Sequence, residues 1–370
     1  MDRPTEVEFV TDDGELIGAD DDVIELGRER PPRWAIALGC AAVLAGFVTL
    51  AATKSHTKPS EPPARPEAVT TATHAPFRFP GAPLQLGGQP NALQAVIFGN
   101  RLYVLRPTEV LVVGVPGGRV LARAALPWPN VILGGAAAQL LLDPDVARLW
   151  VVGTGSSESP VLELDAATLR QRRALVEPTV VFGAAALDGH LYLATPDGLA
   201  DLAPGALHTQ TLSAISPAIA SVTVDPSRKR LLALTTPAPA SVLAVRDGKV
   251  TAARRIGSLV NGNIVVANRQ IWLSGTGRYG AVVIRLDPGT LAPARADPVQ
   301  HLGVATLNGG ARVLWVSAAS DGLWCVDPVT GDTLARWPST TAPVTSRVGD
   351  AYVIERGTVR RLALPERCAG

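Results

Sequence analysis

Side chains that carry out acid–base or metal chemistry are sparse in this sequence. The histidines, His56, His74, His190, His208 and His301, form no pair with the spacing of metal ligands. The segment 156–159 is rich in serine but lacks a Gly-x-Ser-x-Gly nucleophile elbow, and no glycine run leads into a helix as a phosphate-binding loop does. We therefore assign no catalytic residue, no metal and no cofactor. His190 is interpreted as a solvent-facing polar residue of a turn.

The charged residues are balanced over the whole chain but unevenly placed. Lys and Arg total 34 and Asp and Glu 33, yet residues 1–33 contain eleven acidic residues and four arginines, which gives −7 there and +8 in the remainder. Basic clusters at residues 172–173, 228–230, 254–255 and 360–361 are spread over the chain rather than gathered in one stripe. Such charges are typical of soluble strand edges, so we expect no nucleic-acid partner.

A short apolar pattern that returns about every 41 residues identifies the elements that position these side chains. It is LYVL at residues 102–105 and returns as LWVV, LYLA, LLAL, IWLS, LWVS and AYVI. The second residues of the copies, hereafter the anchor residues, are Tyr103, Trp150, Tyr192, Leu232, Trp272, Trp315 and Tyr352, with an average spacing of 41.5. This period is that of one β-propeller blade, and the apolar runs are too short for a helical solenoid.

Turn residues within each repeat divide it into short antiparallel strands. A polar turn such as Asp143-Pro144-Asp145 precedes the anchor strand, a loop of small residues follows it, and a third strand ends in a turn such as residues 327–331. A fourth strand follows that turn. We therefore predict an all-β, seven-bladed β-propeller of four-stranded antiparallel blades over residues 84–370, preceded by one transmembrane helix.

The last repeat lacks one strand of this pattern. It has room for a third strand at residues 358–364 and then ends, which leaves a strand edge in need of a partner. The segment 77–86 ahead of the first repeat can supply the missing strand, and the segment 68–73 is the alternative. We expect the two ends of the propeller to pair with each other.

The repeat at residues 314–337, LWVSAASDGLWCVDPVTGDTLARW, resembles a blade of the bacterial YVTN-type surface propellers and of their pyrroloquinoline-quinone-like and NHL-like relatives. The likeness lies in the repeat rhythm and in the Asp-Pro-x-Thr-Gly turn, and it covers most of residues 84–364. The YVTN tetrapeptide itself is absent. The resemblance implies a propeller but no single activity, because members of these families bind proteins, sugars or metals and some are enzymes.

Candidate ligand-binding residues follow from the geometry of a propeller. The loops that join the second and third strands of the blades converge at one mouth of the central channel, where ligands commonly bind. The most polar side chains of these loops are Arg106, Asp197, Arg278, Tyr279, Asp321 and Glu355. We predict that ligand contacts come from this set.

Two cysteines lie beyond the N-terminal apolar run. Cys325 belongs to the third strand of the sixth repeat and Cys368 to the C-terminal tail, and adjacent blades can bring these segments together. We predict a Cys325–Cys368 disulfide, which an oxidising compartment would form readily. The alternative is a buried Cys325 with a free thiol at Cys368, and cysteine spacing alone does not decide between them.

The N-terminal region predicts a membrane anchor. Residues 34–53 form an uncharged run of 20 residues, long enough to cross a bilayer as one helix. Because 33 mostly acidic residues precede it, we interpret it as an uncleaved signal anchor, with a disordered acidic tail at residues 1–33 and a Pro- and Thr-rich stalk at residues 54–83. Basic residues are equally numerous on both sides, and the composition of the stalk leads us to place the N-terminus in the cytoplasm.

Together these features predict a single-pass plasma-membrane protein whose propeller lies outside the membrane of a bacterial cell. We expect the propeller to act as a binding or protein-interaction platform for an envelope protein or a glycan. Two alternatives stay open. One is an extracytoplasmic hydrolase or lyase that uses acidic residues at the channel mouth, and the other is an envelope signal transducer that acts through the acidic tail. The sequence does not indicate an oligomeric state.

Overall fold

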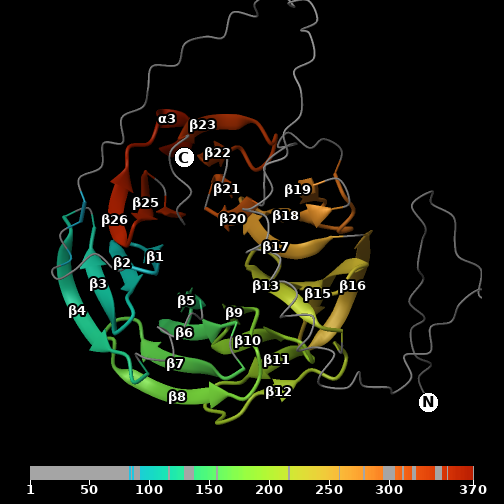
Figure 1. The fold of residues 1–370 in the computed structure, drawn as a ribbon, viewed down its shortest axis with the longest axis horizontal. Helices are drawn as coiled ribbons and strands as arrows, with labels where there is room; N and C mark the ends of the chain where they lie inside the picture. Colours follow the sequence, from blue (N-terminus) through green and yellow to red (C-terminus); the bar gives the residue numbers. More distant parts are fainter. Residues whose placement is uncertain are drawn as a thin grey trace, which may run out of the picture. The chain divides into compact units, whose positions relative to one another are not determined.

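The described strands form antiparallel sheets arranged as a ring (Figure 1). The computed structural model describes residues 83–84, 86, 92–115, 117–128, 137–155, 157–215, 217–257, 259–277, 280–294, 305–310, 312–318, 322–337, 344–347 and 349–369. Within them there are seven sheets, each built from strands that are consecutive in the chain. Residues His74–Gly370 form one compact unit. The fold is a seven-bladed β-propeller, as the repeat period predicts.

The first four blades each contain a meander of four strands. Blade 1 comprises β1 (Gln94–Phe98), β2 (Arg101–Leu105), β3 (Glu109–Gly114) and β4 (Arg119–Ala125). Blade 2 comprises β5 (Ala137–Asp143), β6 (Arg148–Thr154), β7 (Ser159–Asp165) and β8 (Gln171–Glu177). Blade 3 comprises β9 (Gly183–Leu187), β10 (His190–Thr195), β11 (Gly198–Leu202) and β12 (Gln210–Thr211). Blade 4 comprises β13 (Ile219–Asp225), β14 (Arg230–Thr235), β15 (Ala240–Arg246) and β16 (Lys249–Gly257).

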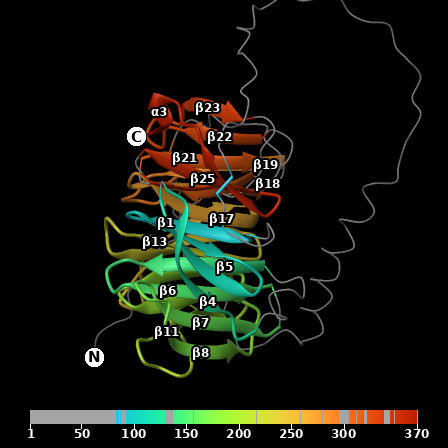
Figure 2. The same cartoon turned by 90° about the vertical axis from the view of Figure 1, so that its left-hand side faces the viewer.

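The last three blades complete the ring. Blade 5 comprises β17 (Val260–Ala267), β18 (Gln270–Gly277) and β19 (Gly280–Leu286). Blade 6 comprises β20 (Ala305–Gly309), β21 (Leu314–Ala318), β22 (Gly322–Val326) and β23 (Thr333–Trp337), and blade 7 comprises β24 (Val344–Arg347), β25 (Asp350–Glu355) and β26 (Thr358–Leu362). A short helix, α3 (Glu366–Ala369), follows β26 and lies beside β23 in the side view (Figure 2).

Two blades have three strands within the described residues, where four were expected. In blade 7 the chain continues from β26 into α3. The outer edge of β26 is instead covered by residues 83–84, which precede blade 1. Pro83 forms an antiparallel bridge with Arg360, and the Leu84 amide donates to the Val359 carbonyl at 2.9 Å. These residues belong to the segment 77–86, which was predicted to close the ring. In blade 5, Pro293 forms a bridge with Leu286 at the corresponding edge.

A second set of contacts joins the two ends of the ring. The Arg347 guanidinium of blade 7 donates to Asn100 Oδ1 of blade 1 at 2.8 Å and also to the Gly99 carbonyl. The Asp350 carboxylate forms an ion pair with the same guanidinium, and its Oδ2 lies 2.7 Å from Arg347 Nη2. Burial disfavours the charge on Asp350, but hydrogen bonds from Arg347 and Arg361 outweigh it and lower the pKa of the carboxyl. The closing contact is therefore made by an arginine in a fixed orientation.

Each neighbouring pair of blades shares one hydrophobic cluster. Among the described residues there are seven such clusters, one at each blade-to-blade interface. The cluster between blades 1 and 2, for example, contains Tyr103 and Val112 from one blade and Leu149 and Leu162 from the other. A single sheet cannot bury both of its faces, so each blade is stabilised by its two neighbours.

Polar side chains of the inner strands connect the blades around the channel. The Gln139 side-chain oxygen on β5 accepts from the Ala184 amide on β9 at 2.8 Å, and Ser221 Oγ on β13 accepts from the Ile264 amide on β17 at 3.4 Å. Gln94 on β1 accepts in the same way from the Leu140 amide on β5. These bonds satisfy backbone groups on the open edges of the inner strands.

The anchor residues also reach across the interfaces. The Tyr103 hydroxyl donates to the Ala166 carbonyl at 3.0 Å, in the turn between the third and fourth strands of the next blade. Trp272 Nε1 donates to the Pro328 carbonyl at 3.0 Å in the corresponding turn of blade 6. Tyr103 and Trp272 therefore each fill an interface and also fix a turn of the neighbouring blade.

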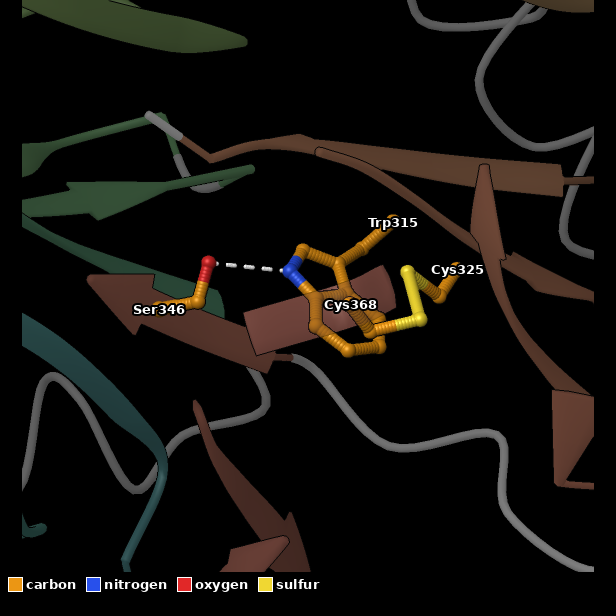
Figure 3. Close-up of a disulfide and its surroundings, with 4 residues drawn as sticks. All are labelled: Trp315, Cys325, Ser346 and Cys368. Carbon is orange, nitrogen blue, oxygen red and sulfur yellow. Dashed lines mark hydrogen bonds between the residues drawn. A yellow bond between two sulfur atoms is a disulfide. The ribbon is translucent and has the colours of Figure 1, made fainter. Parts of the chain in front are cut away.

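Cys325 and Cys368 are joined by a disulfide that attaches the C-terminal helix to blade 6 (Figure 3). Their Cα atoms are 6.3 Å apart, and both side chains are buried. The Trp315 indole lies beside the disulfide, and its Nε1 donates to Ser346 Oγ at 2.9 Å (Figure 3). The helix is also held by a bond from the Gly349 amide to the Ala369 carbonyl. The bridge thus links blade 6, the helix and the first hairpin of blade 7.

The disulfide predicts that two of the cysteines will not react in a thiol titration. The chain has three cysteines, so the denatured, unreduced full-length protein should titrate one thiol, that of Cys40. Cys368→Ser should lower the free energy of unfolding by about 2–4 kcal/mol, because the 43-residue loop is no longer closed. Cys40→Ser is the control and should leave the melting temperature unchanged. Three titratable thiols would contradict the bridge.

Ring closure by the N-terminal segment predicts an effect of truncation. A chain that begins at Gln89 loses Leu84 and Leu86, and the burial of these side chains against blades 7 and 1 stabilises the fold by about 2–4 kcal/mol. Its melting temperature should be several degrees below that of a matched chain that begins at His74. Equal melting temperatures would show that these residues do not close the ring.

Candidate functional site

The meander places two kinds of connection on opposite faces of the ring. The turns between strands 1 and 2 and between strands 3 and 4 of every blade lie on one side, hereafter the turn face. The loops between strands 2 and 3 lie on the other, hereafter the loop face. The residues selected from the sequence belong to the loop face.

Three of the six selected residues are described by the structure. Arg106 is 5% exposed and its guanidinium lies 3.0 Å from Glu109, which also pairs with Arg123 at 3.5 Å. Asp197 is exposed in the loop between β10 and β11, and Glu355 ends β25 opposite Thr358. Arg278, Tyr279 and Asp321 lie outside the described residues.

Hydroxyl groups at the ends of the second strands hold the loops of the loop face. Thr195 Oγ1 donates to the Gly198 carbonyl at 2.9 Å and accepts from the Asp197 amide at 3.3 Å. Thr235 Oγ1 accepts from the Ser241 amide at 2.8 Å. Both threonines are buried. Much of the polarity at this face therefore stabilises the loops themselves.

The turn face carries one motif three times. In each turn the side chain of the first residue, Asp165, Asp287 or Asp327, accepts from the amides two and three residues later. A threonine at the fourth position accepts from the amide two residues beyond it. The fifth residue of each turn has positive φ, and it is Leu169, Leu291 or Gly331. The Asp-Pro-x-Thr-Gly turn noted in the sequence is one member of this set, so its residues act in turn formation.

Two of these turns, those of Asp165 and Asp287, favour the charged form of the carboxylate. Hydrogen bonds from the side chain of Arg172 and from Thr168 lower the pKa of Asp165 to about 2. Hydrogen bonds from the backbone and side chain of Thr290 lower the pKa of Asp287 in the same way. Both carboxylates are therefore fully charged at neutral pH and are engaged by their own turns.

The position of His190 differs from the solvent-facing place in a turn that was expected for it. It begins β10, is partly buried, and places Nδ1 2.9 Å from Asp201 while its ring stacks on Tyr192 with 5.8 Å between centroids. The expectation is wrong because the paired strand β11 brings a carboxylate opposite this position. Burial, together with the charges of Asp201, Asp188 and Asp247, raises the pKa of Tyr192 to about 12.

Two grooves open on the turn face, at equivalent positions between blades. One, of about 310 Å³, lies between blades 1 and 2 and is mainly apolar, with Phe98, Tyr103, Leu142, Pro144 and Ala166 among its lining residues. The other, of about 700 Å³, lies between blades 4 and 5. It is lined by Ser227, Arg228, Arg269, Gln270 and Pro288. The second groove is hereafter the blade 4–5 groove.

The blade 4–5 groove was not predicted from the sequence, because all the candidate residues belong to the loop face. The groove combines the first turn of blade 4, the first turn of blade 5 and Pro288 in the turn that follows β19. A signal for it was present in the run of basic residues 228–230 and in the anchor of blade 4, Leu232, which is not aromatic. Within the described residues, no three His, Cys, Asp or Glu side chains gather as a metal site would require.

Comparison with known proteins supports the fold. No protein-family model and no curated protein matches the sequence. A chain of hydrazine synthase from Kuenenia stuttgartiensis is similar in structure with a TM-score of 0.57 and 13% identity, covering 80% of this chain and 99% of that chain. A chain of a mitotic checkpoint complex gives a TM-score of 0.57 at 11% identity, covering 84% of this chain and 100% of that one.

PorZ of Porphyromonas gingivalis is also similar, with a TM-score of 0.53 and 15% identity over 76% of this chain and 38% of PorZ. It is described as an essential bacterial surface component of the type-IX secretion system. At these identities the likeness concerns the fold alone. The protein is thus a seven-bladed β-propeller, and a closer membership in the YVTN-type, quinone-like or NHL-like families does not follow from it.

The predicted membrane span falls outside the part of the chain that the structure covers. Residues 34–53, with the tail before them and most of the stalk behind them, are not among the described residues. In the segments that are described, no helix has both the length and the apolar character needed to cross a membrane.

The Asp165 turn predicts a measurable electrostatic change. Arg172→Gln removes the hydrogen bond from Arg172 Nη2 at 2.6 Å, so the pKa of Asp165 should rise from about 2 toward 3.8. Because the folded-state pKa is depressed, the contribution of Asp165 to stability is complete above the ordinary pKa and is lost as pH falls through the folded value. The carboxyl pKa can be followed by NMR titration. Arg170→Gln, in the same turn, is the control, and an unchanged pKa in Arg172→Gln would contradict the assignment.

Proposed function

We propose that this protein is a membrane-anchored binding platform, whose propeller engages an envelope protein or a glycan outside the cytoplasmic membrane. Residues 34–53 form the anchor, residues 1–33 remain in the cytoplasm, and residues 54–83 form the stalk that carries the propeller.

The observation that carries this proposal is the way the ring is held. Its buried aromatic anchors, inner-strand bonds and terminal disulfide connect the blades to one another, which leaves the turns and loops of both faces on a rigid scaffold. Residues held in this way can form a preorganised surface for a partner. The blade 4–5 groove, with its volume of about 700 Å³, lies within the size range of ligand sites.

Three further features support the membrane and envelope part of the proposal. The uncharged run at residues 34–53 has the length of a bilayer span. A disulfide that closes the C-terminal end of the propeller is suited to an oxidising compartment. PorZ, a bacterial surface component, has a similar propeller.

Topology tests the proposal directly. Protease added to intact spheroplasts should digest the propeller and leave an epitope tag at the N-terminus intact, because only the propeller is outside. The tag should become accessible to protease and antibody after lysis. A cytoplasmic protein monitored in parallel is the control for spheroplast integrity. A propeller that is protected in intact spheroplasts would overturn the extracytoplasmic assignment.

A further inference from the structure

We infer that the blade 4–5 groove binds a saccharide that carries an anionic group, either a carboxylate or a phosphate. This inference deepens the proposed function, on which it rests for the setting of an envelope glycan.

The interface between blades 4 and 5 lacks an aromatic anchor from blade 4. In blade 1, Tyr103 lines the equivalent groove and donates to the Ala166 carbonyl of the next blade. Leu232 occupies this position in blade 4 and has neither a ring nor a donor. The Pro288 carbonyl accepts instead from Arg230, whose guanidinium also binds Asp225 at 3.0 Å. The groove left above these residues measures about 700 Å³, against about 310 Å³ between blades 1 and 2.

The electrostatic setting favours an anion. Residues 219–290, which form blades 4 and 5, contain ten Lys or Arg and three Asp or Glu, a formal charge of +7. One acidic residue, Asp225, is 1% exposed and lies within 3.6 Å of both Arg228 and Arg230. Its charge is therefore neutralised beneath the groove, where Arg228 and Arg269 form part of the lining.

Arg269 occupies a backbone position at which glycine is favoured. Asn268 and Arg269 both have positive φ, 45° and 62°. In the comparable two-residue turns Asp188-Gly189, Asp247-Gly248 and Arg356-Gly357 the second residue is glycine. An arginine here costs conformational energy, and the exposed side chain forms no ion pair within the described part of the chain. A strained residue with a free charge at the edge of a groove is a sign of a binding role.

The other lining groups suit a sugar. Ser227 carries a hydroxyl and Gln270 a side-chain amide, and both groups can exchange hydrogen bonds with sugar hydroxyls. Guanidinium groups bind carboxylate and phosphate oxygens in paired hydrogen bonds. Recognition of an anionic saccharide uses both kinds of lining residue at once.

The test measures binding to the purified full-length protein by calorimetry at low ionic strength. The probes are trigalacturonate for the carboxylate source, glucose 6-phosphate for the phosphate source, maltotriose as the neutral sugar and tri-aspartate as an acidic peptide. We expect trigalacturonate or glucose 6-phosphate to bind and maltotriose not to bind. Failure of both anionic sugars, or binding of tri-aspartate as tight as that of the better sugar, would overturn the inference.

The variants separate a site from a general attraction. Arg269→Gly should weaken binding of the anionic sugar by about tenfold, the loss of one charge-assisted hydrogen bond, while its melting temperature stays equal or rises because the strained φ is relieved. Arg255→Gln is the matched control, since it removes the same charge from the exposed outer strand β16 of blade 4. Equal loss in both variants would indicate diffuse electrostatics and overturn the site. The topology experiment is independent of these results, so failure of one proposal is distinguishable from failure of the other.

Discussion

The burial of each blade against its two neighbours is the constraint on which the rest of this structure depends. A blade of three or four strands has two faces, and neither is covered by its own residues. The seven clusters between blades in the described part of the chain remove both faces from water only if the ring is complete. This explains why contacts between distant segments close it, such as that of Arg347 with Asn100, 247 residues away.

The same constraint decides which polar residues remain available for a ligand. Arg106 and Thr195 had the residue types of a binding site, yet one is paired with Glu109 and the other closes its own loop. On the turn face, Arg230 links blade 4 to blade 5 through Asp225 and the Pro288 carbonyl. Leu232 packs in the cluster between blades 4 and 5 but has no donor for the Pro288 carbonyl, so Arg230 makes that contact instead.

The sequence predicted the blade number well because the second strand of each blade contributes a large apolar or aromatic anchor to an interface, and these anchors therefore recur in spacing. It predicted ring closure because the last strand of the final repeat, at residues 358–364, has no following strand to pair with its edge. It could not predict the partner of His190, since Asp201 is opposite only once β10 and β11 are paired in register. The blade 4–5 groove combines residues 227, 269 and 288 from three separate turns, and only their positions in space show that they line one surface.

Charge is distributed across the ring in a way that supports the same surface. Residues 137–211, which form blades 2 and 3, contain nine acidic and four basic residues, a formal charge of −5, whereas residues 219–290 carry +7. This difference in charge repels an anion from blades 2 and 3 and attracts it toward the neighbouring blades 4 and 5. Because the ring is held at every interface, the arginines at the groove need little ordering when an anion arrives, and less of the interaction energy is lost to conformational entropy. The ring that completes the fold is thus also what allows Arg228 and Arg269 to act as a site.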